Sequence, residues 1–129
     1  MTRKAFTSDL APPPAGTYSI AMQAGGLVFL AGQTPRDRNN KRHGDAPFAV
    51  QAKMALDNLE AAANAAGLSL KHAVKVSVFL KNPADAREFD EIYAAYVADP
   101  PPVRTLTQSN FVGFDIEVDA ILATAEPRP

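Results

Sequence analysis

The chain has 129 residues, of which 47% are apolar and 21% charged, and its formal net charge is −1. This size and composition predict one globular domain spanning residues 1–129. Basic residues do not outnumber acidic ones and the apolar stretches are short, so we expect neither nucleic acid nor a membrane as a partner. The chain has no cysteine, which excludes disulfides and thiolate sites, and its N-terminus does not have the pattern of a secretory signal, so we expect a cytoplasmic protein.

The first predicted elements are two strands that form a hairpin. Residues 17–23 alternate between polar and apolar side chains, with Tyr18 on the more apolar face. Gly25-Gly26 gives a turn, and residues 27–31 form a second, more buried strand. The polar, charged segment of residues 36–44 is predicted to be a loop.

Two helices are predicted after this hairpin. Pro47 suits a first helical turn, and apolar residues at helical spacing continue to Ala66, where Gly67 provides a stop. The second helix begins at Asn82-Pro83, a capping residue followed by a proline at the first helical position. We expect this helix to end near Asp99, because the following proline cannot continue it.

The remaining predicted elements are strands, over residues 75–80, 103–109 and 115–124. The order of strands and helices predicts an α+β domain, in which a mixed β-sheet carries both helices packed on one face. The opposite face would then leave apolar residues exposed in a monomer, so we expect oligomerisation through the sheet.

Arg104 and Glu117 are the candidate functional residues, and we expect them on neighbouring strands. An arginine binds a planar carboxylate through two parallel hydrogen bonds, and a carboxylate beside it can hold a water molecule or take a proton. This combination indicates a small enzyme acting on an amino-acid-like or keto-acid-like molecule. Three alternatives remain open. Arg104 forms a surface salt bridge or is a packed arginine, Glu117 is simply solvated, or Arg104 and Glu117 pair with each other.

Other kinds of catalytic site have no sequence pattern here. His43 and His72 are the only histidines, and they lack the spacing of metal ligands. No Gly-x-Ser-x-Gly and no Gly-x-Gly-x-x-Gly motif occurs. We therefore expect no metal, no cofactor and no covalent nucleophile.

Several short segments in a fixed order resemble the reactive intermediate deaminase family, also called the Rid or YjgF family. The resemblance covers residues 11–123, nearly the whole chain. The matching segments are Ala11-Pro12, residues 16–19, residues 28–35, residues 51–68, residues 74–80, residues 89–93, residues 102–105 and residues 116–120.

The resemblance implies a homotrimer with sites in the clefts between subunits, and hydrolysis of enamines and imines such as 2-aminoacrylate to a 2-keto acid and ammonia. It implies no cofactor, and a small-molecule imine or keto acid as the partner. By position, Arg104 matches the family arginine that holds the substrate carboxylate, and Glu117 matches the glutamate that positions the attacking water. The other substrate-binding positions implied are Tyr18, Ala31, Gly32, Asp90, Thr105 and, through its main chain, Leu106.

This chain departs from the family pattern at four positions. Thr17 stands where a proline is typical, Ala31 where a serine or glycine is common, Leu106 where a cysteine is common, and Asp90 where an asparagine falls. An added carboxylate at Asp90 would repel an anionic substrate. These changes predict a different or larger imine substrate rather than a different fold.

Two other functions remain open. One is a trimer that binds small carboxylic acids without catalysis, using the same arginine. The other is a structural or partner-binding protein, which includes the nuclease and chaperone roles attached to such proteins; the near-neutral charge argues against a nuclease.

Overall fold

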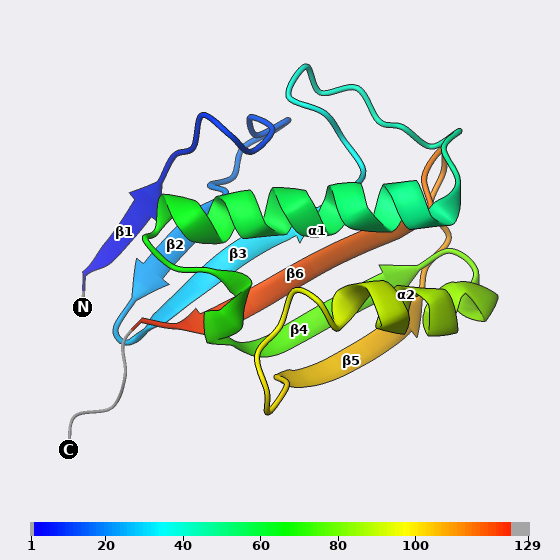
Figure 1. The fold of residues 1–129 in the computed structure, drawn as a ribbon. Helices are drawn as coiled ribbons and strands as arrows, with labels where there is room; N and C mark the ends of the chain where they lie inside the picture. Colours follow the sequence, from blue (N-terminus) through cyan, green and yellow to red (C-terminus); the bar gives the residue numbers. More distant parts are fainter. Residues whose placement is uncertain (1, 125–129) are drawn as a thin grey trace.

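Six strands form one mixed sheet, and two α-helices cover one of its faces (Figure 1). The structure is a computed structural model that describes residues 2–124, so residue 1 and residues 125–129 of the predicted domain lie outside it. In chain order the elements are β1 (Arg3–Phe6), β2 (Ala21–Ala24), β3 (Leu27–Gln33), α1 (Phe48–Ala65), β4 (Ala73–Leu80), α2 (Ala86–Tyr93), β5 (Val103–Gln108) and β6 (Ile116–Ala123). Short 3₁₀ turns precede β4 and α2. The α+β class with two helices on one face is as predicted.

The strand order across the sheet is β1-β2-β3-β6-β4-β5. All neighbours are antiparallel except β4 and β5, which are parallel and are joined through α2. A parallel connection needs a crossover, and α2 supplies it. The expectation that the strands of Arg104 and Glu117 are neighbours is therefore wrong, because β4 lies between β5 and β6.

The core lies between the sheet and α1, which packs a face of small residues close against the strands. Its buried residues recur at helical spacing and include Ala52, Leu56, Leu59 and Ala63. The strands contribute alternate residues, as β6 does with a strict buried and half-buried alternation. Phe89 and Tyr93 of α2 stack on each other, with ring centroids 5.3 Å apart, and close the core over β4 and β5.

The main differences from the predictions concern three elements. Strand β1 was not predicted, because its sequence Arg-Lys-Ala-Phe is largely exposed and lacks an apolar alternation. The strand predicted at residues 17–23 is limited to β2, so Tyr18 lies in the preceding loop. Helix α2 begins at Ala86, after the 3₁₀ turn of Pro83–Asp85, rather than at Asn82-Pro83. It ends at Tyr93 rather than near Asp99, and irregular turns continue the chain to the prolines.

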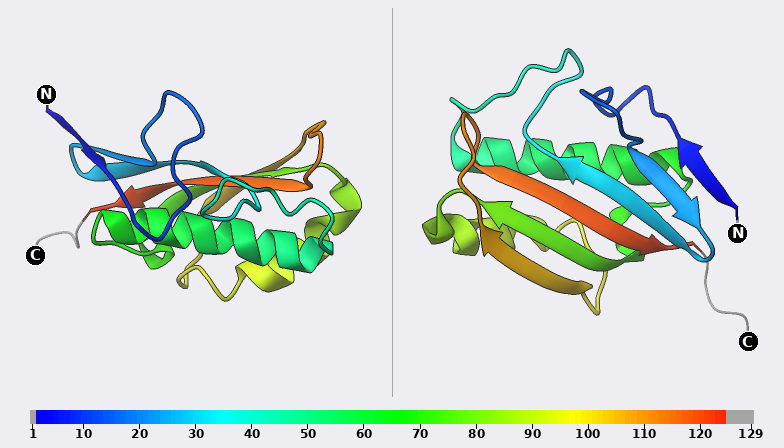
Figure 2. Two further views of the ribbon diagram at one scale, coloured as in Figure 1. Left: turned by 90° about the horizontal axis from the view of Figure 1, so that it is seen from above. Right: turned by 180° about the vertical axis from the view of Figure 1, so that it is seen from behind.

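The second face of the sheet is not covered by either helix (Figure 2). Apolar side chains on it include Leu27 and Phe29, which are 39% and 41% exposed, and Phe29 pairs in register with Ile121 of β6. We call this surface the open face. The oligomerisation expected from such an apolar face stays a prediction.

Candidate active site

Glu117 projects from β6 onto the open face. It pairs in register with Phe79 of β4, whereas the flanking residues Ile116 and Val118 are buried toward the helices. The carboxylate lies against Gly32 of β3, where a Cβ atom would overlap Oε2 of Glu117. Gly32 therefore makes room for the carboxylate at the point where the β3 register shifts.

A cavity of about 400 Å³ opens beside this carboxylate. We call it the Glu117 pocket, and its walls include Tyr18, Ala31, Gly32, Arg36, Arg42 and Glu117. Burial and the nearby carboxylate of Asp119 raise the pKa of Glu117 above its ordinary 4.5, although the charge of Arg42 acts in the opposite direction. A glutamate with a raised pKa, in a cavity, is suited to accept a proton from water.

Tyr18 is held at this pocket by two hydrogen bonds to its hydroxyl oxygen. The N–H of Ala15 donates one at 3.1 Å, and Nη2 of Arg36 donates the other at 3.3 Å. Burial acts to raise the pKa of Tyr18, but these two donors and the charge of Arg42 outweigh it and lower the pKa below 10.0. Four of the predicted site residues, Tyr18, Ala31, Gly32 and Glu117, therefore line one pocket within a single chain.

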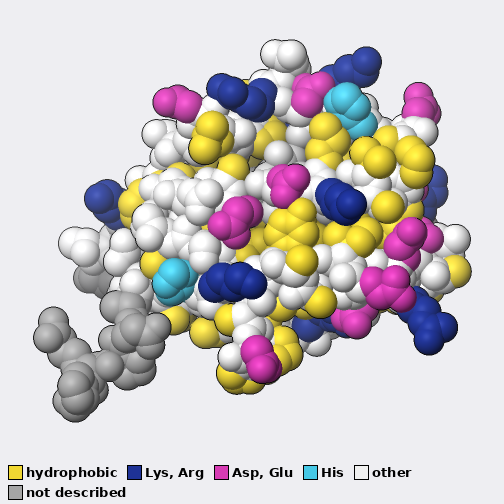
Figure 3. All heavy atoms as spheres, in the orientation of Figure 1, with side chains coloured by type: hydrophobic (Ala, Val, Ile, Leu, Met, Phe, Trp, Pro, Cys, Tyr) yellow, Lys and Arg dark blue, Asp and Glu magenta, His cyan; other side chains and the backbone are white. Residues whose placement is uncertain are grey.

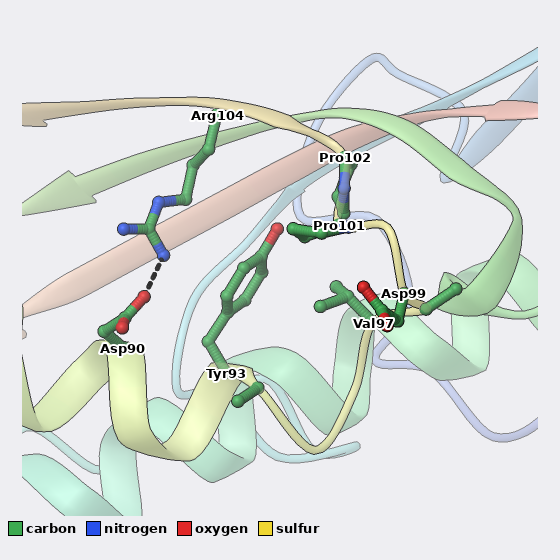
Figure 4. A pocket seen from close by; sticks show the side chains of 9 residues that line it. Asp90, Tyr93, Val97, Asp99, Pro101, Pro102 and Arg104 are labelled. Carbon is green, nitrogen blue, oxygen red and sulfur yellow. Dashed lines mark hydrogen bonds and ion pairs between the residues drawn. The ribbon is translucent and has the colours of Figure 1, made fainter.

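Arg104 lies in a different cavity, between β5 and α2 (Figure 4). This Arg104 pocket has a volume of about 570 Å³, and its walls include Asp90, Tyr93, Val97, Pro101, Pro102 and Arg104. The Arg104 guanidinium lies over the rings of Tyr93 and Phe89, with its central carbon 5.0 and 5.8 Å from the two centroids. The hydroxyl of Tyr93 is buried in the described structure without a hydrogen-bond partner.

Asp90 accepts one hydrogen bond from the guanidinium of Arg104. Nη1 of Arg104 donates to Oδ1 of Asp90 at 2.8 Å (Figure 4), so the two side chains form an ion pair. The Asp90 side chain is 64% exposed and that of Arg104 is 28% exposed. Exposed pairs of this kind contribute only ~0–1 kcal/mol. A ligand carboxylate that offers two oxygens can therefore replace Asp90 at little cost.

The three successive β5 residues predicted to bind substrate do not share one face. Arg104 aligns with the buried Val76 of β4 and points toward α2, and Leu106 points the same way and packs against the core. Thr105 points to the open face, where its hydroxyl accepts a hydrogen bond from Lys75 Nζ at 2.6 Å. One chain therefore places Tyr18, Ala31, Gly32 and Glu117 in one pocket and Asp90 and Arg104 in the other. Thr105 and Leu106 line neither pocket.

Two residues of the Glu117 pocket, Arg36 and Arg42, were not singled out in the sequence. They lie in the loop predicted for residues 36–44 and form an isolated antiparallel bridge with each other. The turn between them includes Asn40, which adopts the left-handed conformation with φ of 65°. The Asn-Asn pair between the two arginines was the available signal for a chain reversal that brings them together.

The described residues, 2–124, contain no cluster of three or more His, Asp and Glu side chains arranged to hold a metal ion. Within the same range, neither helix combines the length and apolarity needed to cross a bilayer. On the face that carries α1 and α2, lysine and arginine side chains are dispersed among acidic and apolar ones (Figure 3).

Comparison with known proteins identifies the family. Residues 8–124 match the family described as Endoribonuclease L-PSP. Protein DfrA of Myxococcus xanthus is 37% identical over 125 residues, which cover 94% of this chain and 95% of that protein. The 2-iminobutanoate/2-iminopropanoate deaminase of Dermatophagoides farinae is 29% identical over 103 residues, covering 80% of each chain.

A solved structure agrees with these sequence matches. The crystal structure of RidA from an Antarctic Psychrobacter superposes with a TM-score of 0.86 at 31% identity, over 93% of this chain and 98% of that one. The chain therefore belongs to the YjgF/RidA/RutC family, as its sequence segments indicated.

Proposed function

We infer that this protein is a cofactor-independent deaminase that hydrolyses small 2-imino acids, in equilibrium with their 2-enamino forms, to 2-keto acids and ammonia. The observation that carries this proposal is the carboxylate of Glu117, half-buried in a cavity with a raised pKa and next to a glycine that leaves it space. Family membership supports the proposal, because a relative carries the name of such a deaminase.

The proposed site lies between subunits of a homotrimer. Arg104 and Glu117 point to opposite faces of the sheet in one chain, so a single chain does not place both around one small molecule. The apolar open face, with Phe29 and Leu27 exposed, is the surface that a second chain would cover. Closed assembly through such faces is the common solution for homo-oligomers. In this arrangement Arg104 of one subunit serves the Glu117 pocket of its neighbour.

The chemistry is a redox-neutral hydrolysis. Proton transfer to the terminal carbon of 2-aminoacrylate gives 2-iminopropanoate, whose C2 atom is electrophilic. Arg104 holds the carboxylate, and Glu117 takes a proton from water as the water oxygen bonds to C2. Return of that proton to nitrogen gives a carbinolamine. Transfer of its hydroxyl proton to nitrogen then lets the C2–N bond break, and ammonia leaves as C2=O forms. A positioned base of this kind contributes ~10²–10⁴-fold to rate.

A second candidate is a trimer that binds small carboxylic acids without turning over an imine. Arg104 would hold the ligand carboxylate in this function as well, and its ion pair with Asp90 opposes an anionic ligand equally in both functions. A nuclease is less well supported, given the formal net charge of −1 and the dispersed cations in Figure 3.

The deciding experiment measures release of ammonia and pyruvate from freshly generated 2-aminoacrylate. The deaminase proposal expects the rate with enzyme to exceed the rate in buffer and to depend on Arg104. Thermal stabilisation by pyruvate without any rate above buffer would instead establish the binding protein.

A further inference from the structure

The Glu117 pocket contains an arginine pair that the proposed reaction does not use. Arg36 and Arg42 face each other across an isolated bridge, and His43 N–H donates to Pro35 O at 2.8 Å just beyond it. Helix α1 fixes this segment, because Nδ2 of Asn58 donates to the carbonyls of Thr34 at 3.0 Å and Arg36 at 2.8 Å. The position of the pair is therefore set by the fold rather than by a free loop.

Arg36 is a buried cation without a carboxylate partner. It is only 6% exposed, and no acidic side chain within residues 2–124 lies at ion-pair distance from it. Its Nη2 donates to the Tyr18 hydroxyl, a neutral group, at 3.3 Å. Buried charges in proteins are normally paired, so this guanidinium lacks the counter-ion that its burial calls for.

Arg42 adds a second positive charge to the same cavity. Its Nε donates to Oγ1 of Thr34 at 3.3 Å, and its guanidinium lies over the ring of Phe114, 4.4 Å from the centroid. Like charges held opposite each other are unfavourable unless an anion lies between or beside them. Glu117 is the acidic residue in the wall of the cavity, so two cations and one carboxylate leave an excess of one positive charge.

We propose that the Glu117 pocket binds a second carboxylate of the substrate, so that the preferred substrates are imines of dicarboxylic 2-keto acids with four or five carbons. The inference rests on the proposed deaminase function and adds its specificity. Arg104 of the neighbouring subunit holds the carboxylate next to the imine carbon, and Arg36, with Arg42, holds the distal carboxylate. A cavity of about 400 Å³ has space for the additional methylene and carboxylate groups.

The reaction itself is unchanged by the second carboxylate. For the four-carbon substrate, water adds to the imine carbon of 2-iminobutanedioate and one of its protons moves to nitrogen. The hydroxyl proton of the resulting carbinolamine then moves to nitrogen, and the C–N bond breaks to give 2-oxobutanedioate and ammonia. No oxidant or reductant takes part. The distal carboxylate remains ionised throughout and contributes binding and orientation only.

The test compares kcat/KM for 2-iminobutanedioate and 2-iminopropanoate, each generated in the assay by an amino-acid oxidase. The wild-type protein is expected to prefer the dicarboxylate by at least ~10-fold, in the range of a charge-assisted hydrogen bond. Arg36→Met should lower kcat/KM for 2-iminobutanedioate much more than kcat/KM for 2-iminopropanoate, so that the preference is lost. Arg38→Met, an exposed arginine of the same loop, is the matched control and should keep the preference.

A direct binding measurement separates failure of the inference from failure of the proposed function. Calorimetry should show 2-oxoglutarate binding more tightly than 2-oxobutanoate, with the difference lost in Arg36→Met and partly retained in Arg36→Lys. If Arg36→Met does not fold, Arg36→Lys and Arg42→Gln carry the comparison. Equal kcat/KM for the two imines, or a preference unaffected by Arg36 and Arg42, would overturn the inference and leave the deaminase function intact. Turnover of neither imine would contradict the deaminase function itself, and 2-oxoglutarate binding would then decide the second carboxylate site.

Discussion

Arg104 and Glu117 lie on opposite faces of one sheet, on strands that β4 separates. Arg104 aligns with Val76 of β4 and points toward α2, whereas Glu117 aligns with Phe79 and points to the open face. Because successive residues of a strand alternate between faces, this separation is a property of the register and no side-chain rotation removes it. A site that uses both residues on one small molecule therefore needs two chains.

A complementation experiment tests this arrangement. Arg104→Ala and Glu117→Gln should each be nearly inactive alone, but a re-assembled equal mixture should regain about one quarter of wild-type activity. The reason is that a site is intact only where a subunit that retains Arg104 meets a neighbour that retains Glu117. The measurement is kcat of the mixture after dissociation and re-association, with native mass confirming mixed trimers. Mixed trimers without recovered activity would show that the two residues do not share a site.

Asp90 is expected to weaken ligand binding by competing for Arg104. Asp90→Asn removes an exposed ion pair worth ~0–1 kcal/mol, so pyruvate should bind up to about fivefold more tightly. The measurement is the calorimetric Kd. Glu91→Gln, the next residue on α2 and also exposed, is the control for a general change of charge. Weaker binding in Asp90→Asn would mean that Asp90 orients the arginine instead of occupying it.

The sequence predicted the helices and strands better than it predicted which strands are neighbours in the sheet. The spacing of apolar residues and the stop at Gly67 identified α1, and the alternation in residues 115–124 identified β6. Both signals are local, since each arises within one helix or strand. Strand β1 was not predicted, because an exposed edge strand needs no alternation of apolar residues.

The sequence named candidate site residues but did not predict how they are arranged in the fold. Arg104 and Glu117 are close in sequence, but the crossover through α2 places β5 at the edge of the sheet, beyond β4. Strand order depends on such long-range connections, which the spacing between two residues does not contain. Arg36 and Arg42 were not predicted as site residues for a similar reason. Their proximity depends on the turn at Asn40 and on the hydrogen bond that Asn58 makes to this loop.

Gly32→Ala should reduce activity by displacing Glu117. An added Cβ would overlap Oε2 of Glu117 and lie 3.2 Å from its Cγ, so the side chain has to move while the backbone of β3 is kept. Displacement of a reacting group by about 1 Å costs ~10²-fold, and we expect a loss of this size in kcat with little change in Tm. Gly26→Ala is the control, because its Cβ would meet Thr124 Oγ1 at an ordinary 3.8 Å. Full activity in Gly32→Ala would argue against a catalytic position for this carboxylate.

Glu117→Gln should lower activity and, at neutral pH, raise stability. The pKa of Glu117 is raised in the folded protein, so the unfolded chain loses this proton at a lower pH than the folded protein does. The free energy of unfolding of the wild type therefore falls as the pH rises from the ordinary pKa of 4.5 through the pKa of the folded protein. Glutamine does not ionise, so the variant should match the wild type below this window and exceed it above. Denaturant unfolding at fixed protein concentration and several pH values measures the difference, with the exposed Glu88→Gln as control. If the stability of the variant relative to the wild type instead grew toward acid pH, the raised pKa would be contradicted. The wild type would then gain stability as Glu117 ionises.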